Sequence, residues 1–281
     1  MKVIAVLGIG PGLGLSVARR WAAEGYAVAM VSRSPARHDA YLARLPVAAV
    51  SERRDPVDDR EKLSDPAALL PPTQSRGGDS SGRAFAPAAP ESTAPVHRAY
   101  VADVTDAGAL GEVLARISAD FGRIDAVYFG PAAAGRRGIV PLPEADADAL
   151  REPIELLLLP LPTLVAAVLP EMLARGDGTI LIPTGLSGRR PMPALGNLAP
   201  VSAALRMYAL TLAAALAGEG VHVGALTIGG LIAGGDIHRM VMAGNPGLPT
   251  LDPDEIAAAA WRLALDRTET ELVFDLMPDR L

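Results

Sequence analysis

Short apolar runs alternate along this chain with longer segments in which apolar residues recur every three or four positions. The runs predict strands, at residues 3–7, 26–32, 97–104, 124–129, 179–183, 221–228 and 271–274. The longer segments predict helices, at residues 13–24, 110–121, much of 144–175, 198–218 and 254–265, with a break at Pro160 and Pro162 as an alternative in 144–175. Strands that alternate with helices, and that are apolar at nearly every position, indicate a parallel sheet covered by helices on both faces. We therefore expect an α/β fold with a doubly wound parallel sheet.

One segment, residues 46–97, departs from this pattern. It contains eight prolines, a glycine pair at 77 and 78, and many serine, alanine and arginine residues. Such a composition is typical of a chain that does not pack a core of its own. Because the strands on both sides are clear, we interpret 46–97 as a flexible insertion in a single domain spanning residues 1–281. It fits either a tolerated surface loop or an arm that contacts a substrate or partner.

A glycine-rich turn joins the first predicted strand to the first predicted helix. Glycine permits a tight turn, a close approach of the backbone to a pyrophosphate, and close packing of the helix on the sheet. The N-terminus of the helix then offers free N–H groups and the positive end of its dipole to phosphates. The turn predicts a Rossmann-type dinucleotide site; the alternative is a glycine-rich turn that holds no ligand. The residues concerned are Gly8, Gly10, Gly12, Leu13 and Gly14.

The end of the second predicted strand indicates which dinucleotide is bound. An acidic residue at this position holds the ribose hydroxyls of NAD, whereas an arginine accommodates the 2′-phosphate of NADP. Here no carboxylate is present, and Arg33 follows Ser32 directly. NADP(H) is therefore favoured over NAD(H), with Ser32 and Arg33 at the ribose. The alternative is that Arg33 is only a solvated charge at the end of a strand.

Composition excludes several classes of function. The net charge of −6 and the pI near 5.3 argue against nucleic-acid binding, which needs a basic face. The absence of cysteine excludes disulfides and thiol nucleophiles, and the four scattered histidines predict no metal site. The apolar stretch 154–173 contains two glutamates and three prolines, which favours a buried helix pair over a membrane span. With only a short apolar run at the start of the chain, we expect a cytoplasmic protein.

The order of these motifs resembles the short-chain dehydrogenase/reductase family, over nearly the whole chain outside 46–97. Beyond the glycine turn, the resemblance rests on Ala102-Asp103-Val104-Thr105, Phe121–Asp125, Gly178–Leu181, Gly218–Val223 and Asp252–Ala257. It implies an NAD(P)-dependent oxidoreductase in which Asp103 and Val104 lie at the adenine. It places Gly130 and Gly229 beside the cofactor, at the ends of the fourth and sixth strands. It also implies a homodimer or homotetramer paired through residues 150–175 and 198–218, and a substrate lid over 231–250.

The catalytic residues of the family are missing at the matching positions. The family uses Tyr-x-x-x-Lys, a preceding Ser and an Asn to transfer a proton and polarise a carbonyl. Aligned on the fifth strand, these positions read Leu198, Ser202, Gly185 and, near the Asn position, Leu157. The only lysines in the chain are Lys2 and Lys62, so no other register restores a Tyr–Lys pair. We expect a cavity lined by apolar side chains, which favours a hydrophobic small-molecule ligand.

Three side chains are candidates to replace the missing acid and base. Thr184 and Ser187 flank the position of the missing Ser and can hydrogen-bond a carbonyl, or only cap the turn after the strand. His238 lies in the glycine-rich segment 231–250, where it is the one residue type whose charge changes near neutral pH. Its alternative is a surface histidine without a function.

Three functions are compatible with an intact glycine turn beside missing catalytic residues. The first is an atypical NADP(H)-dependent oxidoreductase that acts on a hydrophobic small molecule. The second is a sensor or interaction protein that binds NADP(H) without turnover. The third is a cyclase or isomerase that uses the same fold without redox chemistry. The fold alone does not decide among them.

Overall fold

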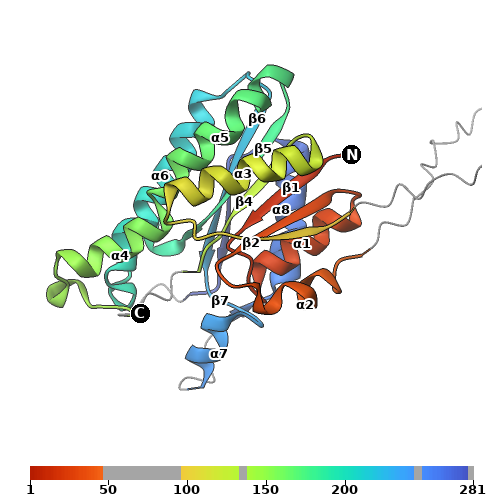
Figure 1. Ribbon diagram of the computed structural model, residues 1–281. Helices are drawn as coiled ribbons and strands as arrows, with labels where there is room; N and C mark the ends of the chain where they lie inside the picture. Colours follow the sequence, from red (N-terminus) through yellow and green to blue (C-terminus); the bar gives the residue numbers. More distant parts are fainter. Residues whose placement is uncertain (47–95, 133–137, 244–248, 278–281) are drawn as a thin grey trace, which may run out of the picture. The chain divides into compact units, whose positions relative to one another are not determined.

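The fold is seen in a computed structural model, which describes residues 1–46, 96–132, 138–243 and 249–277 (Figure 1). Most of the predicted insertion 46–97 lies outside the described residues. Seven strands form one sheet in the order β3-β2-β1-β4-β5-β6-β9, and every neighbouring pair is parallel. The strands are β1 Val3–Leu7, β2 Ala27–Ser32, β3 Arg98–Val101, β4 Ala126–Phe129, β5 Gly178–Gly185, β6 Val221–Gly229 and β9 Glu271–Asp275. The predicted α/β fold class is confirmed.

Helices cover both faces of the sheet (Figure 1). One face is covered by α3 Ala107–Phe121, α5 Pro160–Arg175 and α6 Leu198–Ala215. The other is covered by α1 Leu13–Ala23 and α8 Pro253–Asp266, where the rings of Trp21 and Trp261 meet edge to face with centroids 5.1 Å apart. The remaining helices are α2 His38–Leu42, α4 Ala147–Leu157 and α7 Asp236–Met242. Because both faces are buried, the central strands are apolar at nearly every position, as their sequence predicts, whereas the edge strands β3 and β9 are partly exposed and carry charged residues.

Within 144–175 the chain forms two helices, so the alternative with a break at Pro160 is confirmed. Helix α4 ends at Leu157, and α5 begins at Pro160, which needs no N–H partner in the first turn of a helix. By length and composition alone, residues 147–175 and 198–215 are long and apolar enough to cross a membrane. The core helices of soluble proteins also meet this criterion, and here α5 and α6 pack on the sheet.

A histidine joins the two ends of the predicted insertion. The ring of His97 accepts a hydrogen bond at Nδ1 from the backbone N–H of Val28, at 3.2 Å, and lies 3.2 Å from the carbonyl of Pro46 at Nε2. Because Nδ1 accepts, Nε2 carries the proton and donates to Pro46. Burial lowers the pKa of His97, which favours this neutral form. Pro46 and His97, at the two borders of the predicted insertion, are therefore in direct contact.

The order of the strands fixes where a ligand can bind. The chain builds the sheet outward from β1 to β3 and then returns to add β4, β5 and β6 on the other side. In such sheets ligands bind in the crevice beyond the carboxyl ends of the strands, where the order reverses. Here that crevice opens between the loops that follow β1 and β4.

Candidate functional site

The glycine turn after β1 is held against two neighbouring strands. The N–H groups of Gly8 and Ile9 both donate to the carbonyl of Val31 in β2, at 3.0 and 3.1 Å. Gly8 has a φ of +78°, and a Cβ atom there would lie 2.4 Å from Cα of Pro131. Only glycine fits this position, because the conformation and the space both exclude a side chain. The turn is thus fixed tightly beside the end of β4.

The N-terminus of α1 is open to an anion. Among the described residues, no side chain caps this helix. A Cβ atom on Gly10 would meet nothing within 4 Å, so the turn is bare on that side. Uncapped N–H groups and the helix dipole attract phosphate groups at such an end. This geometry fits the pyrophosphate of a dinucleotide.

Two cavities meet at the glycine turn. The first, here called the inner cavity, has a volume of about 360 Å³ and is bounded by β4, β5, α6 and residues 230–238. The second, here called the strand-two cavity, has about 400 Å³ and lies at the end of β2. Both are lined by Gly8, Gly10, Pro131, Ala132 and Asp236. The two cavities therefore form the two arms of one cleft, with the glycine turn between them.

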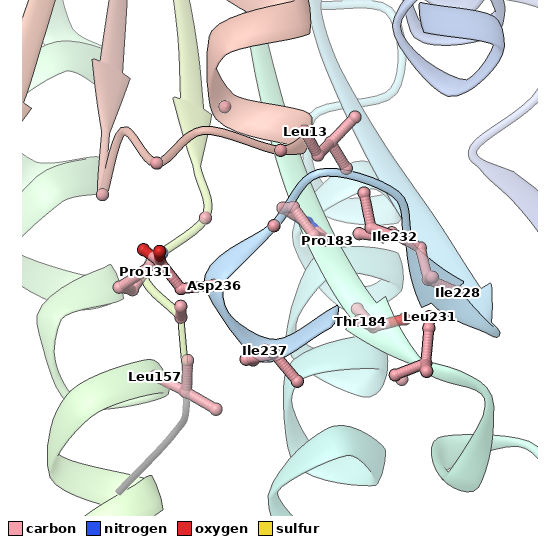
Figure 2. A pocket seen from close by; sticks show the side chains of 18 of the residues that line it. Leu13, Pro131, Leu157, Pro183, Thr184, Ile228, Leu231, Ile232, Asp236 and Ile237 are labelled. Atoms are coloured by element: carbon pink, nitrogen blue, oxygen red, sulfur yellow. The ribbon is translucent and has the colours of Figure 1, made fainter. Parts of the chain in front are cut away.

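The inner cavity is mainly apolar (Figure 2). Its aliphatic lining includes Leu157, Leu195, Leu198, Leu205, Leu231 and Ile237. Leu157 and Leu198 stand where the resemblance places Asn and Tyr. This lining fits a hydrophobic ligand and offers few groups that stabilise a developing charge.

Hydroxyl groups gather where the resemblance places a catalytic serine. Gly185 occupies that position, and a Cβ atom on it would lie 2.7 Å from Oγ of Ser202 and 3.3 Å from Oγ of Ser187. Ser187 is buried, and its hydroxyl has no hydrogen-bond partner within the described part of the chain. A buried hydroxyl without a partner is uncommon, and here it lines a cavity, where a ligand can satisfy it. Ser187 therefore does not cap the turn after β5.

Thr184 adds a second polar group to the inner cavity. It stands at the end of β5 on the cavity wall (Figure 2), and its Oγ1 lies 2.9 Å from Oγ1 of Thr227 in β6. Thr227 donates to Oε1 of Glu271 in β9 at 2.5 Å. Thr184 is thus the cavity end of a hydrogen-bonded network, and the turn-capping alternative is wrong for it as well.

Residues 231–243 and 249–251 cover the glycine turn. Strand β7 Leu231–Ile232 pairs with β8 Thr250–Leu251, and α7 follows β7. A Cβ atom on Gly12 would lie 3.1 Å from Cα of Gly235, so this segment touches the turn. At the first residue of α7, Asp236 accepts a hydrogen bond of 2.7 Å from Arg37, which follows β2. His238 lines the inner cavity, and residues 244–248 lie outside the described part.

Comparison with protein-family models shows to which family this chain belongs. The short chain dehydrogenase model matches residues 82–235, which is more than half of the chain. This chain belongs to the short chain dehydrogenase family. The comparison with curated protein sequences gave no match.

Solved structures of this family share the fold. A metagenomic short-chain oxidoreductase in complex with NADP is 18% identical, with a TM-score of 0.68 and coverage of 99% of this chain and 98% of that one. An alcohol dehydrogenase from the archaeon Thermococcus sibiricus, complexed with 5-hydroxy-NADP, is 22% identical, with a TM-score of 0.67 and coverage of 100% and 99%. A short chain dehydrogenase/reductase family protein is 22% identical, with a TM-score of 0.69 and coverage of 98% and 95%. These likenesses show the fold.

Most of the residues predicted to bind the cofactor of a short chain dehydrogenase line the cleft. The inner cavity is lined by Gly8, Gly10, Gly12, Leu13, Gly14 and Gly130, and the strand-two cavity by Ser32, Arg33 and Val104. Asp103 and Gly229 line neither cavity. Asp103 accepts hydrogen bonds from the N–H and hydroxyl of Thr105, at 3.0 and 2.8 Å. The carbonyl of Gly229 accepts the N–H of Leu276 at 2.9 Å.

The hydroxyl of Ser32 is already engaged in hydrogen bonds within the protein. Its hydroxyl donates to the carbonyl of Ser34 at 2.9 Å and lies 2.7 Å from Nε2 of His38. Since its one proton is used, Ser32 accepts from His38, which is neutral because burial lowers its pKa. Ser32 can offer a ribose only a remaining lone pair. Arg33 is exposed and stands at the same cavity.

Sequence reasoning missed three residues of this site. Arg37 lines the strand-two cavity. Thr227 and Glu271 continue the network that begins at Thr184. A glutamate within an apolar terminal strand was the one available signal, because a buried carboxylate needs partners.

Proposed function

We propose that this protein is an NADP(H)-dependent oxidoreductase that acts on a hydrophobic small molecule. The observation that carries the proposal is the single cleft with the glycine turn at its centre. On one side of the turn are two arginines, and on the other an apolar cavity with buried hydroxyls. One arm fits the phosphate-bearing end of a dinucleotide, and the other fits a nicotinamide with an apolar substrate.

Charge at the end of β2 supports NADP(H) over NAD(H). Arg33 and Arg37 line the strand-two cavity, and β2 ends without a carboxylate. A guanidinium matches the geometry of a phosphate, which NADP carries at the 2′ position and NAD lacks. Two family members of the same fold are described in complex with NADP and with 5-hydroxy-NADP, which supports the same choice here.

The residues of this chain set limits on the chemistry. A bound nicotinamide supplies transfer of an electron pair with hydrogen. The glycine turn and the N-terminus of α1 would hold its pyrophosphate, and Arg33 with Arg37 its 2′-phosphate. Lys2 pairs with Asp177 before β1, at the opposite end of the strands from the cleft. The proton must therefore pass through hydroxyl groups, His238 or water rather than through a Tyr–Lys pair.

The proposal extends to assembly and location. Several small or apolar residues are exposed on α5 and α6, among them Ala166, Ala167, Leu173, Ala203 and Met207. Alanine allows two helices to approach closely, so these faces suit pairing between subunits in a homodimer or homotetramer. The cytoplasm is the proposed location.

A sensor that binds NADP(H) without turnover is the second candidate. The contact between Gly12 and Gly235 and the pair between Arg37 and Asp236 tie α7 to the edge of the cleft. A phosphate bound by Arg37 would break its pair with Asp236 and release α7, and such a displacement is a signal that a partner can detect. A cyclase or isomerase is the third candidate, and no particular contact favours it.

Turnover separates these candidates. The purified protein is mixed with NADPH and a panel of hydrophobic ketones and enones, and with NADP⁺ and the matching alcohols, while nicotinamide absorbance is followed. The oxidoreductase predicts a change that depends on the substrate and disappears in Gly12→Asp, whose side chain would meet the backbone of Gly235 and repel phosphates. Nucleotide binding with no absorbance change across the panel would favour the sensor.

A further inference from the structure

Thr184 begins a chain of hydrogen bonds that runs from the inner cavity through the sheet. Its Oγ1 lies 2.9 Å from Oγ1 of Thr227, whose hydroxyl lies 2.5 Å from Oε1 of Glu271. Thr184 and Thr227 are direct partners on β5 and β6, and both are buried. The chain therefore leads from the cavity wall across β6 to β9 without passing through solvent.

Glu271 is held in its ionised form. Nε and Nη2 of Arg206 donate to its two oxygens, both at 2.8 Å, and Nη1 of Arg189 lies 3.7 Å from Oε2. The hydrogen bonds from Arg206 hold the pKa of Glu271 below its ordinary value of 4.5, although burial acts in the opposite direction. A bidentate arginine is among the strongest partners of a carboxylate. At neutral pH Glu271 has no proton to donate.

The ionised carboxylate of Glu271 fixes which hydroxyl donates and which accepts in each of these hydrogen bonds. A carboxylate only accepts hydrogen bonds, so Thr227 gives its one hydroxyl proton to Glu271. The bond between the two threonines can then form only if Thr184 donates and Thr227 accepts. With its own proton used in this way, Thr184 has only a lone pair to offer to the inner cavity.

We propose that Thr184 binds the ligand as a hydrogen-bond acceptor, so that the inner cavity selects a hydrophobic alcohol over the matching ketone. Ser187 supports this choice, because it lines the same cavity and its buried hydroxyl uses its proton for no hydrogen bond within the described residues. An alcohol oxygen donates as well as accepts, whereas a ketone oxygen only accepts. A ketone would leave Thr184 without a ligand partner, and sites built around a substrate hydroxyl discriminate strongly against analogues that lack it.

The same hydrogen bonds, from Thr184 through Thr227 to Glu271, give the proton of the alcohol a route out of the cavity. This part of the inference rests on the proposed function, since a bound oxidised nicotinamide would accept the electron pair. The alcohol carbon gives up its hydrogen with that pair, the O–H bond breaks, and C–O becomes C=O. The released proton moves to Thr184 while the proton of Thr184 moves to Thr227 and that of Thr227 moves to Glu271. Glu271, which is half-buried beside Arg189, then returns the proton to solvent.

Binding measurements with matched alcohols and ketones test whether Thr184 offers the ligand an acceptor. The full-length protein is titrated calorimetrically with three pairs, cyclohexanol and cyclohexanone, menthol and menthone, and borneol and camphor, with and without NADP⁺. In at least one pair we expect the alcohol to bind about tenfold more tightly than the ketone, the effect of about one hydrogen bond. Equal affinities, tighter ketones throughout, or no alcohol bound by the wild type would overturn the proposal.

Variants of the two threonines give the sharper result. Thr184→Val should abolish the preference for the alcohol, while Thr184→Ser retains it. Thr227→Val removes the acceptor of the Thr184 proton, so that Thr184 can donate into the cavity, and the preference should shift toward the ketone. Thr227→Ser is its control. If Thr227→Val does not fold, the comparison of Thr184→Val with Thr184→Ser decides.

The failure of this inference and that of the proposed function are distinguishable. Nucleotide binding is measured in a separate titration with NADPH. A preference for alcohols without nucleotide binding would contradict the oxidoreductase and leave the acceptor role of Thr184 in place. Nucleotide binding with no preference for alcohols would contradict the acceptor role of Thr184 and leave the proposed oxidoreductase in place.

Discussion

Nη1 of Arg37 lies 2.7 Å from Oδ2 of Asp236, and this ion pair joins the segment after β2 to the first residue of α7. The two residues are 199 positions apart, and both line the strand-two cavity. The hydrogen bond from Arg37 lowers the pKa of Asp236, which keeps this carboxylate charged. A nucleotide phosphate and Asp236 therefore compete for the same guanidinium.

Removing the charge of Asp236 should strengthen nucleotide binding. Asp236→Asn frees Arg37 and removes a negative charge near the site of the phosphates. We expect the Kd of NADPH to fall about three- to tenfold, in line with the modest energy of an exposed ion pair. Calorimetric titration measures it. Asp254→Asn, which breaks the exposed pair with Arg19, is the matched control and should leave the Kd unchanged. Weaker binding by Asp236→Asn would show that the carboxylate does not compete.

The two arginines of the strand-two cavity should discriminate between nucleotides. Arg33→Ala and Arg37→Ala should each raise the Kd of NADPH about tenfold, because a charged hydrogen bond to the 2′-phosphate is lost. The Kd of NADH should change little. Titrations of both nucleotides into each variant measure the ratio of the two Kd values, with Arg19→Ala, whose side chain pairs with Asp254, as control. An equal loss for both nucleotides would mean that the arginines do not contact the 2′-phosphate.

Gly185 and Ser202 should show strong coupling in stability. A Cβ atom on Gly185 would lie 2.7 Å from Oγ of Ser202, so Gly185→Ala should lower the free energy of unfolding by about 1–2 kcal/mol. The backbone there is extended and suits alanine. In a Ser202→Ala background the same change should cost less, because only the contacts of 3.3 Å with Cβ of residue 202 and Oγ of Ser187 remain. Urea unfolding of the four proteins of this cycle gives the coupling energy, and additive effects would refute the contact.

Three histidines should make the protein less stable in mild acid. Burial lowers the pKa of His38, His97 and His222 below the ordinary value of 6.5. Below about pH 6.5 the unfolded chain therefore binds more protons than the folded one, and stability falls as the pH drops toward the folded pKa values. Glu271 and Asp177 have lowered carboxyl pKa values and act only at lower pH.

The loss of stability in mild acid can be measured as the free energy of unfolding in urea between pH 8 and pH 5. His97→Gln should flatten part of the slope, because glutamine can bond Val28 and Pro46 without titrating. An unchanged slope in His97→Gln would remove His97 from the account, and a rise in stability toward pH 5 would contradict the direction for all three residues.

The fold was predictable because its signals are local. Continuous apolar strands, the glycine turn after Leu7 and the alternation with helices each follow from neighbouring residues. At Gly8, for example, a tight turn predicts glycine. The structure adds the reason, because a Cβ atom on Gly8 would lie 2.4 Å from Cα of Pro131. The prolines at 160 and 162 indicated a break within 144–175, and the structure places it just before Pro160.

The catalytic side of the site was only partly predictable. The absence of a Tyr–Lys pair follows from counting lysines, and Thr184 and Ser187 follow from their place after the fifth strand. The role of Thr184 depends on Thr227, Glu271 and Arg206, which come from different elements. Nothing in a local pattern reports contacts across three strands and a helix. The pair of Arg37 and Asp236 was hidden for the same reason.

The central claim is that the cleft binds NADP(H), and thermal unfolding with added nucleotide tests it most directly. A ligand of the native state at about 100 times its Kd adds about 2.7 kcal/mol, which is a shift in Tm of several degrees. We predict that NADPH raises the Tm of the wild type more than NADH does, and that Gly12→Asp abolishes the shift with both. No shift with either nucleotide, in a protein that unfolds cooperatively, would contradict the account.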